Sequence, residues 1–176
     1  MNKNYHNEIK DLFYLEPIIY NDSRGYFFEA YSDNDFKKTN FIQDNESKSK
    51  FGVLRGIHFQ KKPYEQSKLV RVLLGQIQDV AVDLRLNSPT YKKYFSIILD
   101  DKNKKQLFIP RGFGHAFLTL STEAIVSYKV DQSYNNVSES GIRYNDPSIN
   151  IKWQLNDNKI ILSNKDNKLS YLLSNK

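Results

Sequence analysis

The chain has 176 residues, of which 39% are apolar and 14% aromatic, with no cysteine and a formal net charge of +6. This composition suits one packed domain over residues 1–176 and excludes a disordered chain, a disulfide-stapled fold and thiolate metal sites. No apolar run approaches the roughly 20 residues that span a bilayer, and the start Met1–Tyr5 is polar. We therefore expect a cytoplasmic protein with no membrane partner.

Strand patterns dominate the chain, and no repeat or linker divides it. Short helices are expected only at Asp33–Lys38, where Ser32 is a candidate N-cap, and in the C-terminal tail. Many short strands separated by Gly, Pro or Asn turns favour an antiparallel sandwich or barrel. In chain order the predicted strands span residues 12–20, 26–31, 53–60, 67–85 (two strands joined near Gly75), 94–99, 106–109, 116–120 and 124–130.

The predicted strand Val53–Gln60 carries the most informative side chains. Strand alternation directs His58 and Gln60 to one face and Ile57 and Phe59 to the other. A histidine and an amide on the same strand face are typical of a pocket floor. A hydrogen-bonded core histidine fits the same pattern, so spacing alone leaves both interpretations open.

The positive charge does not indicate a nucleic-acid partner. Lysines scatter through turns and termini without forming a stripe, and no recognition-helix motif is present. Several of the six arginines instead lie beside glycine or within apolar strands, where a planar guanidinium can bind phosphate oxygens in pairs. A small phosphorylated ligand is the better expectation.

A second polar cluster, Pro110–Phe117, places His115 at the end of a P-x-G-x-x-H spacing. This spacing resembles the second motif of cupins, which implies an all-β, cupin-like double-stranded β-helix (a jelly-roll barrel) with short peripheral helices. The first cupin motif usually supplies H-x-H, whereas this chain has His58-Phe59-Gln60. The set of metal ligands is therefore depleted, and we expect neither a metal nor another cofactor. A metal-dependent cupin enzyme using His58 and His115 remains the alternative.

Ordered blocks along nearly the whole chain carry a more specific resemblance. They are residues 22–29, 43–45, 52–60, 68–70, 79–85, 88–91, 109–117, 128–129, 141–143, 145–147 and 162–166. Together they resemble the dTDP-4-dehydrorhamnose 3,5-epimerase family. The resemblance implies epimerisation of a nucleotide-linked 4-keto-6-deoxyhexose at C3 and C5, which converts dTDP-4-dehydro-6-deoxyglucose to dTDP-4-dehydrorhamnose.

The C3 and C5 hydrogens of such a sugar are acidic because each carbon adjoins the C4 carbonyl. Inversion needs a base on one face, stabilisation of the enolate, and an acid on the opposite face. By resemblance, His58 is the base and Asp166 orients its ring. Lys68 holds the developing enolate oxygen, and Tyr128 returns the proton from the far face.

The resemblance also implies a set of substrate contacts and a homodimer with strand exchange. Near the sugar and diphosphate it implies Arg55, Gln60, His115 and Arg143, with Tyr134 as a second tyrosine tied to completing the double epimerisation. The nucleotide contacts are Gln43 and Asn45. The residues expected to reach into the partner's site are Arg24, Phe27 and Glu29, with Phe27 against the base.

Other functions remain open at this stage. Relatives of similar sequence perform a single epimerisation or act as ketosugar isomerases on other nucleotide sugars. A catalytically silent nucleotide-sugar-binding protein would keep the barrel and lose turnover. Isotope exchange into the sugar distinguishes these alternatives.

Overall fold

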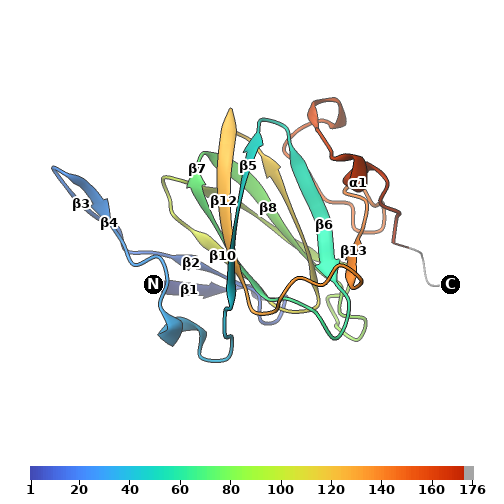
Figure 1. Ribbon diagram of the computed structural model, residues 1–176, viewed down its shortest axis with the longest axis horizontal. Helices are drawn as coiled ribbons and strands as arrows, with labels where there is room; N and C mark the ends of the chain where they lie inside the picture. Colours follow the sequence, from blue (N-terminus) through green and yellow to red (C-terminus); the bar gives the residue numbers. More distant parts are fainter. Residues whose placement is uncertain (173–176) are drawn as a thin grey trace.

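The computed structural model describes residues 1–172, which fold into two antiparallel sheets facing each other (Figure 1). In spatial order the six-stranded sheet contains β1 (Asn2–Tyr5), β2 (Phe13–Glu16), β10 (Gln106–Ile109), β7 (Lys68–Leu74), β12 (Glu123–Val130) and β5 (Gln43–Lys50). The five-stranded sheet contains β13 (Glu139–Gly141), β6 (Leu54–Gln60), β11 (Phe113–Thr119), β8 (Gln76–Asp83) and β9 (Tyr94–Asp100). The predicted all-β, cupin-like jelly roll is confirmed.

The space between the sheets holds the main apolar core, and strand alternation supplies it from both sides. Val70 and Val126 face inward from the six-stranded sheet, and Ile77 and Ala81 face them from the five-stranded sheet. The alternate residues of β8, such as Val80, pack outward under residues 142–153 of the C-terminal segment. Because both faces of the five-stranded sheet are covered, β8 is buried along almost its whole length.

Three short elements lie at the periphery of the sandwich. They are the 3₁₀ turns Asp33–Phe36 and Asp157–Lys159 and the helix α1 (Asn164–Asn167). The expected helix at Asp33–Lys38 is therefore a single 3₁₀ turn, and Ser32 makes no side-chain cap hydrogen bond. The tail helix is present as α1, and its N-cap Ser163 accepts a hydrogen bond from the backbone of Asp166 at 3.0 Å.

Two of the predicted strands are shorter than the sequence suggests, and three strands were missed. The run 12–20 is interrupted after Glu16, where Pro17 removes a backbone donor, and pairing resumes only at Tyr20. The run 26–31 forms strand only as far as Phe27. The missed strands are β1, β5 and β13. In β5 (QDNESKSK) only Ser49 is buried, so this edge strand shows no apolar alternation.

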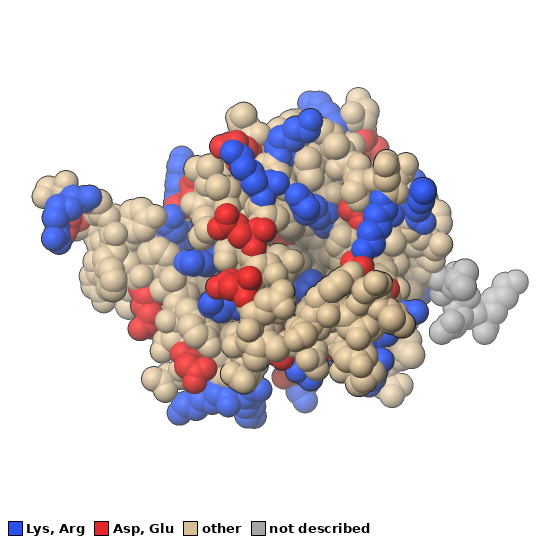
Figure 2. Space-filling model, in the orientation of Figure 1, with Lys and Arg blue, Asp and Glu red and all other residues tan. Residues whose placement is uncertain are grey.

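A two-stranded hairpin, β3 (Tyr20–Asp22) and β4 (Gly25–Phe27), projects away from the sandwich (Figure 1). All six of its residues are exposed, including two tyrosines and Phe27. Figure 2 shows basic and acidic side chains interspersed over the face in view, without a basic stripe. No helix within residues 1–172 is long and apolar enough to cross a membrane.

Candidate active site

A cavity of about 510 Å³ opens between the two sheets and contains all four predicted catalytic side chains. His58 comes from β6, Lys68 from the start of β7, Tyr128 from β12, and Asp166 from α1. Two larger surface hollows, of about 770 and 890 Å³, contain none of these four residues. The smaller cavity is therefore the candidate active site.

Strand register places these groups together. In the antiparallel pair β6–β11, His58 lies directly opposite His115. Gly56 makes this approach feasible, because its φ is +122° and a Cβ there would collide with His115 and Ala116 of β11. In the pair β7–β12, the Lys68 Nζ lies 5.7 Å from the centre of the Tyr128 ring. Lys68 shares the inward face of β7 with Val70, and Tyr128 shares the inward face of β12 with Val126.

His58 and Asp166 form a hydrogen-bonded pair. The His58 Nε2 is 2.5 Å from the Asp166 Oδ1, and the Asp166 side chain is only 4% exposed. Burial raises the pKa of this carboxyl, but the hydrogen bond and charge of His58 outweigh burial and lower the pKa overall. The ionised carboxylate accepts, so in the neutral form of His58 the hydrogen is on Nε2 and Nδ1 keeps its lone pair.

Lys68 lines the cavity together with two other cations, Arg55 and Lys165, and burial lowers the pKa of Lys68 to about 8. The charges of Asp79 and Glu139 oppose that shift. Asp79 is fully buried and accepts from the His115 Nε2 at 2.6 Å, while its Oδ2 finds no hydrogen-bond partner among residues 1–172. Burial also lowers the pKa of His115, so this imidazole is neutral near pH 7.

Tyr128 supplies a phenol on another wall of the cavity. Burial raises the pKa of this phenol, and the positive charge of Arg55 only partly opposes the shift. Tyr128 therefore keeps its proton at neutral pH and can donate it. Arg55 is held at the cavity edge by hydrogen bonds from its Nε to the Ser49 hydroxyl (3.0 Å) and from its Nη2 to the Lys48 carbonyl (3.2 Å).

The predicted binding residues divide into those near the cavity and those elsewhere. Arg55 and His115 line it. Asn45 lies opposite Tyr128 in the β5–β12 register, and its side chain accepts a hydrogen bond from the Gln43 amide at 2.7 Å. Gln43 and Asn45 therefore lie at the end of β5 that is next to Tyr128. Tyr134 is 56% exposed, and its hydroxyl donates to Glu139 at 2.6 Å.

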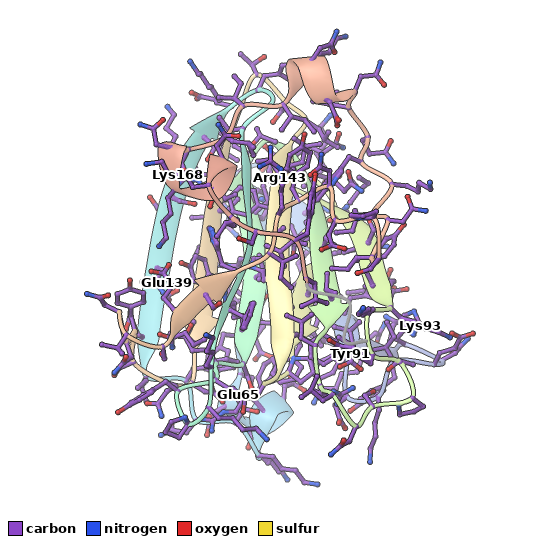
Figure 3. The ribbon with its side chains drawn as sticks, turned by 90° about the vertical axis from the view of Figure 1, so that its right-hand side faces the viewer. Glu65, Tyr91, Lys93, Glu139, Arg143 and Lys168 are labelled. Atoms are coloured by element: carbon purple, nitrogen blue, oxygen red, sulfur yellow. The ribbon has the colours of Figure 1, made fainter. Side chains whose placement is uncertain are left out.

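Gln60 and Arg143 are not among the residues that line this cavity, and their expected contacts with the sugar and the diphosphate stay predictions. The Gln60 amide is occupied by hydrogen bonds to loop residues. The Arg143 Nη1 donates to the Asn167 carbonyl at 3.0 Å, which ties β13 to the C-terminal segment. Figure 3 shows Arg143 and Lys168 toward one end of the molecule and Glu139 farther along.

Arg24, Phe27 and Glu29 also lie away from the cavity of their own chain. Arg24 is exposed on the hairpin and pairs with Asp22, with 2.6 Å between Nη2 and Oδ2. Phe27 is 70% exposed and makes no part of any apolar core cluster among residues 1–172. Within one chain, then, these three residues have no access to the catalytic groups.

Three residues near the catalytic groups were missed at the level of sequence. Asp79 occupies an inward position of a buried strand, which was an available signal. Lys165 lines the cavity next to Asp166 within the motif 162–166. Glu139 pairs with Lys165 at 2.5 Å, and no local pattern indicated this contact. Residues 1–172 contain no cluster of three or more His, Cys, Asp or Glu side chains arranged to hold a metal ion.

Known proteins resemble this chain in both sequence and fold. A family model described as dTDP-4-dehydrorhamnose 3,5-epimerase matches residues 6–174. The Shigella flexneri protein of that name is 46% identical over 164 residues, 90% of each chain. The crystal structure of the protein of that name from Elizabethkingia anophelis has a TM-score of 0.92 at 43% identity, over 97% of this chain and 96% of the other. The Legionella pneumophila dTDP-6-deoxy-D-glucose-3,5-epimerase in complex with dTDP-4-keto-L-rhamnose has a TM-score of 0.92 at 41% identity, over 97% and 92%.

Proposed function

Because the chain belongs to the dTDP-4-dehydrorhamnose 3,5-epimerase family, we propose that it converts dTDP-4-dehydro-6-deoxyglucose to dTDP-4-dehydrorhamnose within a single domain. The observation that carries the proposal is the convergence of a His58–Asp166 pair, a half-buried lysine and a protonated phenol on one cavity. A base, an electrophile and an acid are the groups that inversion beside a carbonyl requires.

Each inversion begins with removal of a proton from the carbon next to the carbonyl. The Nδ1 of His58 takes this proton, because Nε2 is committed to Asp166. The electron pair of the broken C–H bond forms the C=C bond of the enolate, and the carbonyl oxygen becomes negative. Asp166 stabilises the imidazolium that forms, as the orienting carboxylate does in hydrolase triads.

The enolate oxygen lies toward the Lys68 ammonium, which stabilises charge as it develops. Tyr128 then donates its proton to the opposite face of the same carbon, and the enolate electrons form the new C–H bond. Solvent restores the proton on the phenolate and removes the one on His58. The same groups serve the second carbon after the ring shifts.

Substrate binding uses the remaining polar groups of the cavity and its rim. Arg55 contacts the diphosphate, with His115 beside the sugar and Tyr134 at the mouth. Gln43 and Asn45 contact the nucleotide. The expected cytoplasmic location stays a prediction.

We also propose a homodimer that exchanges the hairpin β3–β4. An isolated two-stranded hairpin is marginally stable in water, and this one exposes Tyr20, Tyr26 and Phe27 by 61, 58 and 70%. Insertion into the partner would cover these rings and bring Arg24, Phe27 and Glu29 to the partner's nucleotide.

Incubation in D₂O with dTDP-4-dehydro-6-deoxyglucose tests the reaction, because each enolate exchanges its hydrogen with solvent. We expect deuterium at both C3 and C5, detected by NMR and mass spectrometry. His58→Ala is the matched control and should lose exchange at both carbons.

The other outcomes identify the alternatives. Deuterium at one carbon only would indicate a mono-epimerase. Binding of the nucleotide sugar without exchange would indicate a silent binding protein. Stoichiometric metal by elemental analysis, together with loss of activity on chelation, would indicate a metal-dependent cupin enzyme.

A further inference from the structure

The side chain of Gln60 is fully hydrogen bonded at the end of β6, two residues beyond His58. It is 8% exposed, and its Nε2 donates to the Tyr64 carbonyl at 2.7 Å and to the Ser133 carbonyl at 3.3 Å. Its Oε1 accepts from the Asn135 backbone at 2.6 Å and from the Ser138 hydroxyl at 3.4 Å. One amide therefore joins the loop 61–67 to the loop 131–138.

The contacts to the second loop flank a single residue. Gln60 binds the carbonyl of Ser133 and the N–H of Asn135, which are the backbone groups on either side of Tyr134. The Gln60 amide thus replaces the backbone of a neighbouring strand, because its Nε2 donates to the carbonyl before Tyr134 and its Oε1 accepts from the N–H after it. This arrangement fixes the backbone of Tyr134 while its side chain remains 56% exposed. Because the ring is mostly exposed, the backbone tether and the hydroxyl hydrogen bond to Glu139 are the contacts that hold it.

The tethered residue belongs to a chain of contacts that ends at the catalytic pair. The Tyr134 hydroxyl donates to Glu139, which pairs with Lys165, the residue before Asp166. Glu139 also lies opposite Gln60 in the β13–β6 register, and Gly141 lies opposite His58. In Figure 3 Glu139 lies above Glu65, a residue of the first loop.

We propose that Gln60 is a positioning residue whose amide fixes Tyr134 and the Glu139–Lys165 pair at the rim of the cavity. The inference rests on the proposed function for its kinetic consequence, but the tether itself does not. A misplacement of about 1 Å near reacting groups can cost about 100-fold in rate. We expect Gln60→Met, which keeps the length and apolar volume, to lower kcat by about 10- to 100-fold.

Backbone hydrogen exchange tests the tether without any substrate. In Gln60→Met the Asn135 amide loses its acceptor, and its exchange should accelerate at least about tenfold while amides of β8 remain protected. Equal exchange of Asn135 in the two proteins would overturn the proposal. Gln66→Met is the matched control, because its Nε2 joins the same loops through the Gln132 carbonyl at 2.7 Å without flanking Tyr134. It should leave Asn135 exchange and turnover near wild type.

A double-mutant cycle tests whether Gln60 acts through Tyr134. If it does, Gln60→Met combined with Tyr134→Phe should cost no more than the larger single effect. A double variant whose loss of kcat equals the product of the two single losses would overturn the proposal. Absence of solvent exchange into the sugar by the wild-type protein would instead reject the proposed function, and the Asn135 measurement would still decide the tether.

Gln60→Glu supplies a pH signature. A neutral carboxyl can donate to the Ser133 or Tyr64 carbonyl, whereas an ionised carboxylate can only repel them. The rate relative to wild type should therefore rise as pH falls, while Gln60→Met shows a constant ratio. A constant ratio for Gln60→Glu, with thermal unfolding unchanged across the same pH range, would contradict the assigned donor role.

Discussion

Replacement of Asp166 by Asn isolates the charge that supports the base. The variant keeps the size of the side chain and the backbone hydrogen bond to Ser163 that starts α1. It removes the negative charge 2.5 Å from the His58 Nε2. Two unit charges about 4 Å apart interact by about 4 kcal/mol at an effective dielectric constant of about 20, which corresponds to about 1000-fold in rate.

A neutral amide oxygen can still accept from Nε2, which restores about 1 kcal/mol. The expected loss in kcat for Asp166→Asn is therefore between about 100- and 1000-fold, measured as the initial rate of deuterium entry at C3 and C5. Glu8→Gln, which removes the acid of an exposed pair with Lys93, is the control and should change kcat less than about twofold. A folded Asp166→Asn protein that loses less than about fivefold would refute the assigned role.

Three further predictions concern the acid, the cation and the dimer. Because the pKa of Lys68 is about 8, its positive charge is lost as pH rises through that value, so kcat/KM should fall above pH 8. Lys68→Arg should move this fall to higher pH, and a wild-type profile that stays flat well above pH 8 would contradict the role. Tyr128→Phe should lower product formation by about 100-fold while deuterium exchange through His58 persists; unchanged turnover, measured by NMR, would exclude Tyr128 as the acid. Phe27→Ser should weaken the dimer in sedimentation velocity without lowering the unfolding temperature of the monomer, because Phe27 is 70% exposed. A dimer as tight as wild type would remove the hairpin from the interface.

The parts of the fold that follow a local rule could be predicted from the sequence. Alternation with a period of two correctly separated His58, which lines the cavity, from Ile57 and Phe59, which pack on the other face of β6. Edge strands could not be predicted in this way. β5 gains its stability from pairing with β12 rather than from buried side chains, so it has no apolar pattern to detect.

Local patterns also could not predict the surroundings of residues that contact distant segments of the chain. Gln60 shares the face of His58, but β6 ends there, and loop backbone rather than cavity surrounds the amide. Arg143 suits a phosphate by its chemistry, but the C-terminal segment docks on it. The partner of Asp166 followed only from the family resemblance, because nothing in the tail itself distinguishes this acid from its solvated neighbours.

The His58–Asp166 contact joins residues 108 positions apart, and Asp166 lies outside both sheets. A variant truncated after Ser163 would retain every strand of the two sheets but leave the imidazole without its carboxylate. Loss of turnover in such a variant would therefore not require loss of the sandwich.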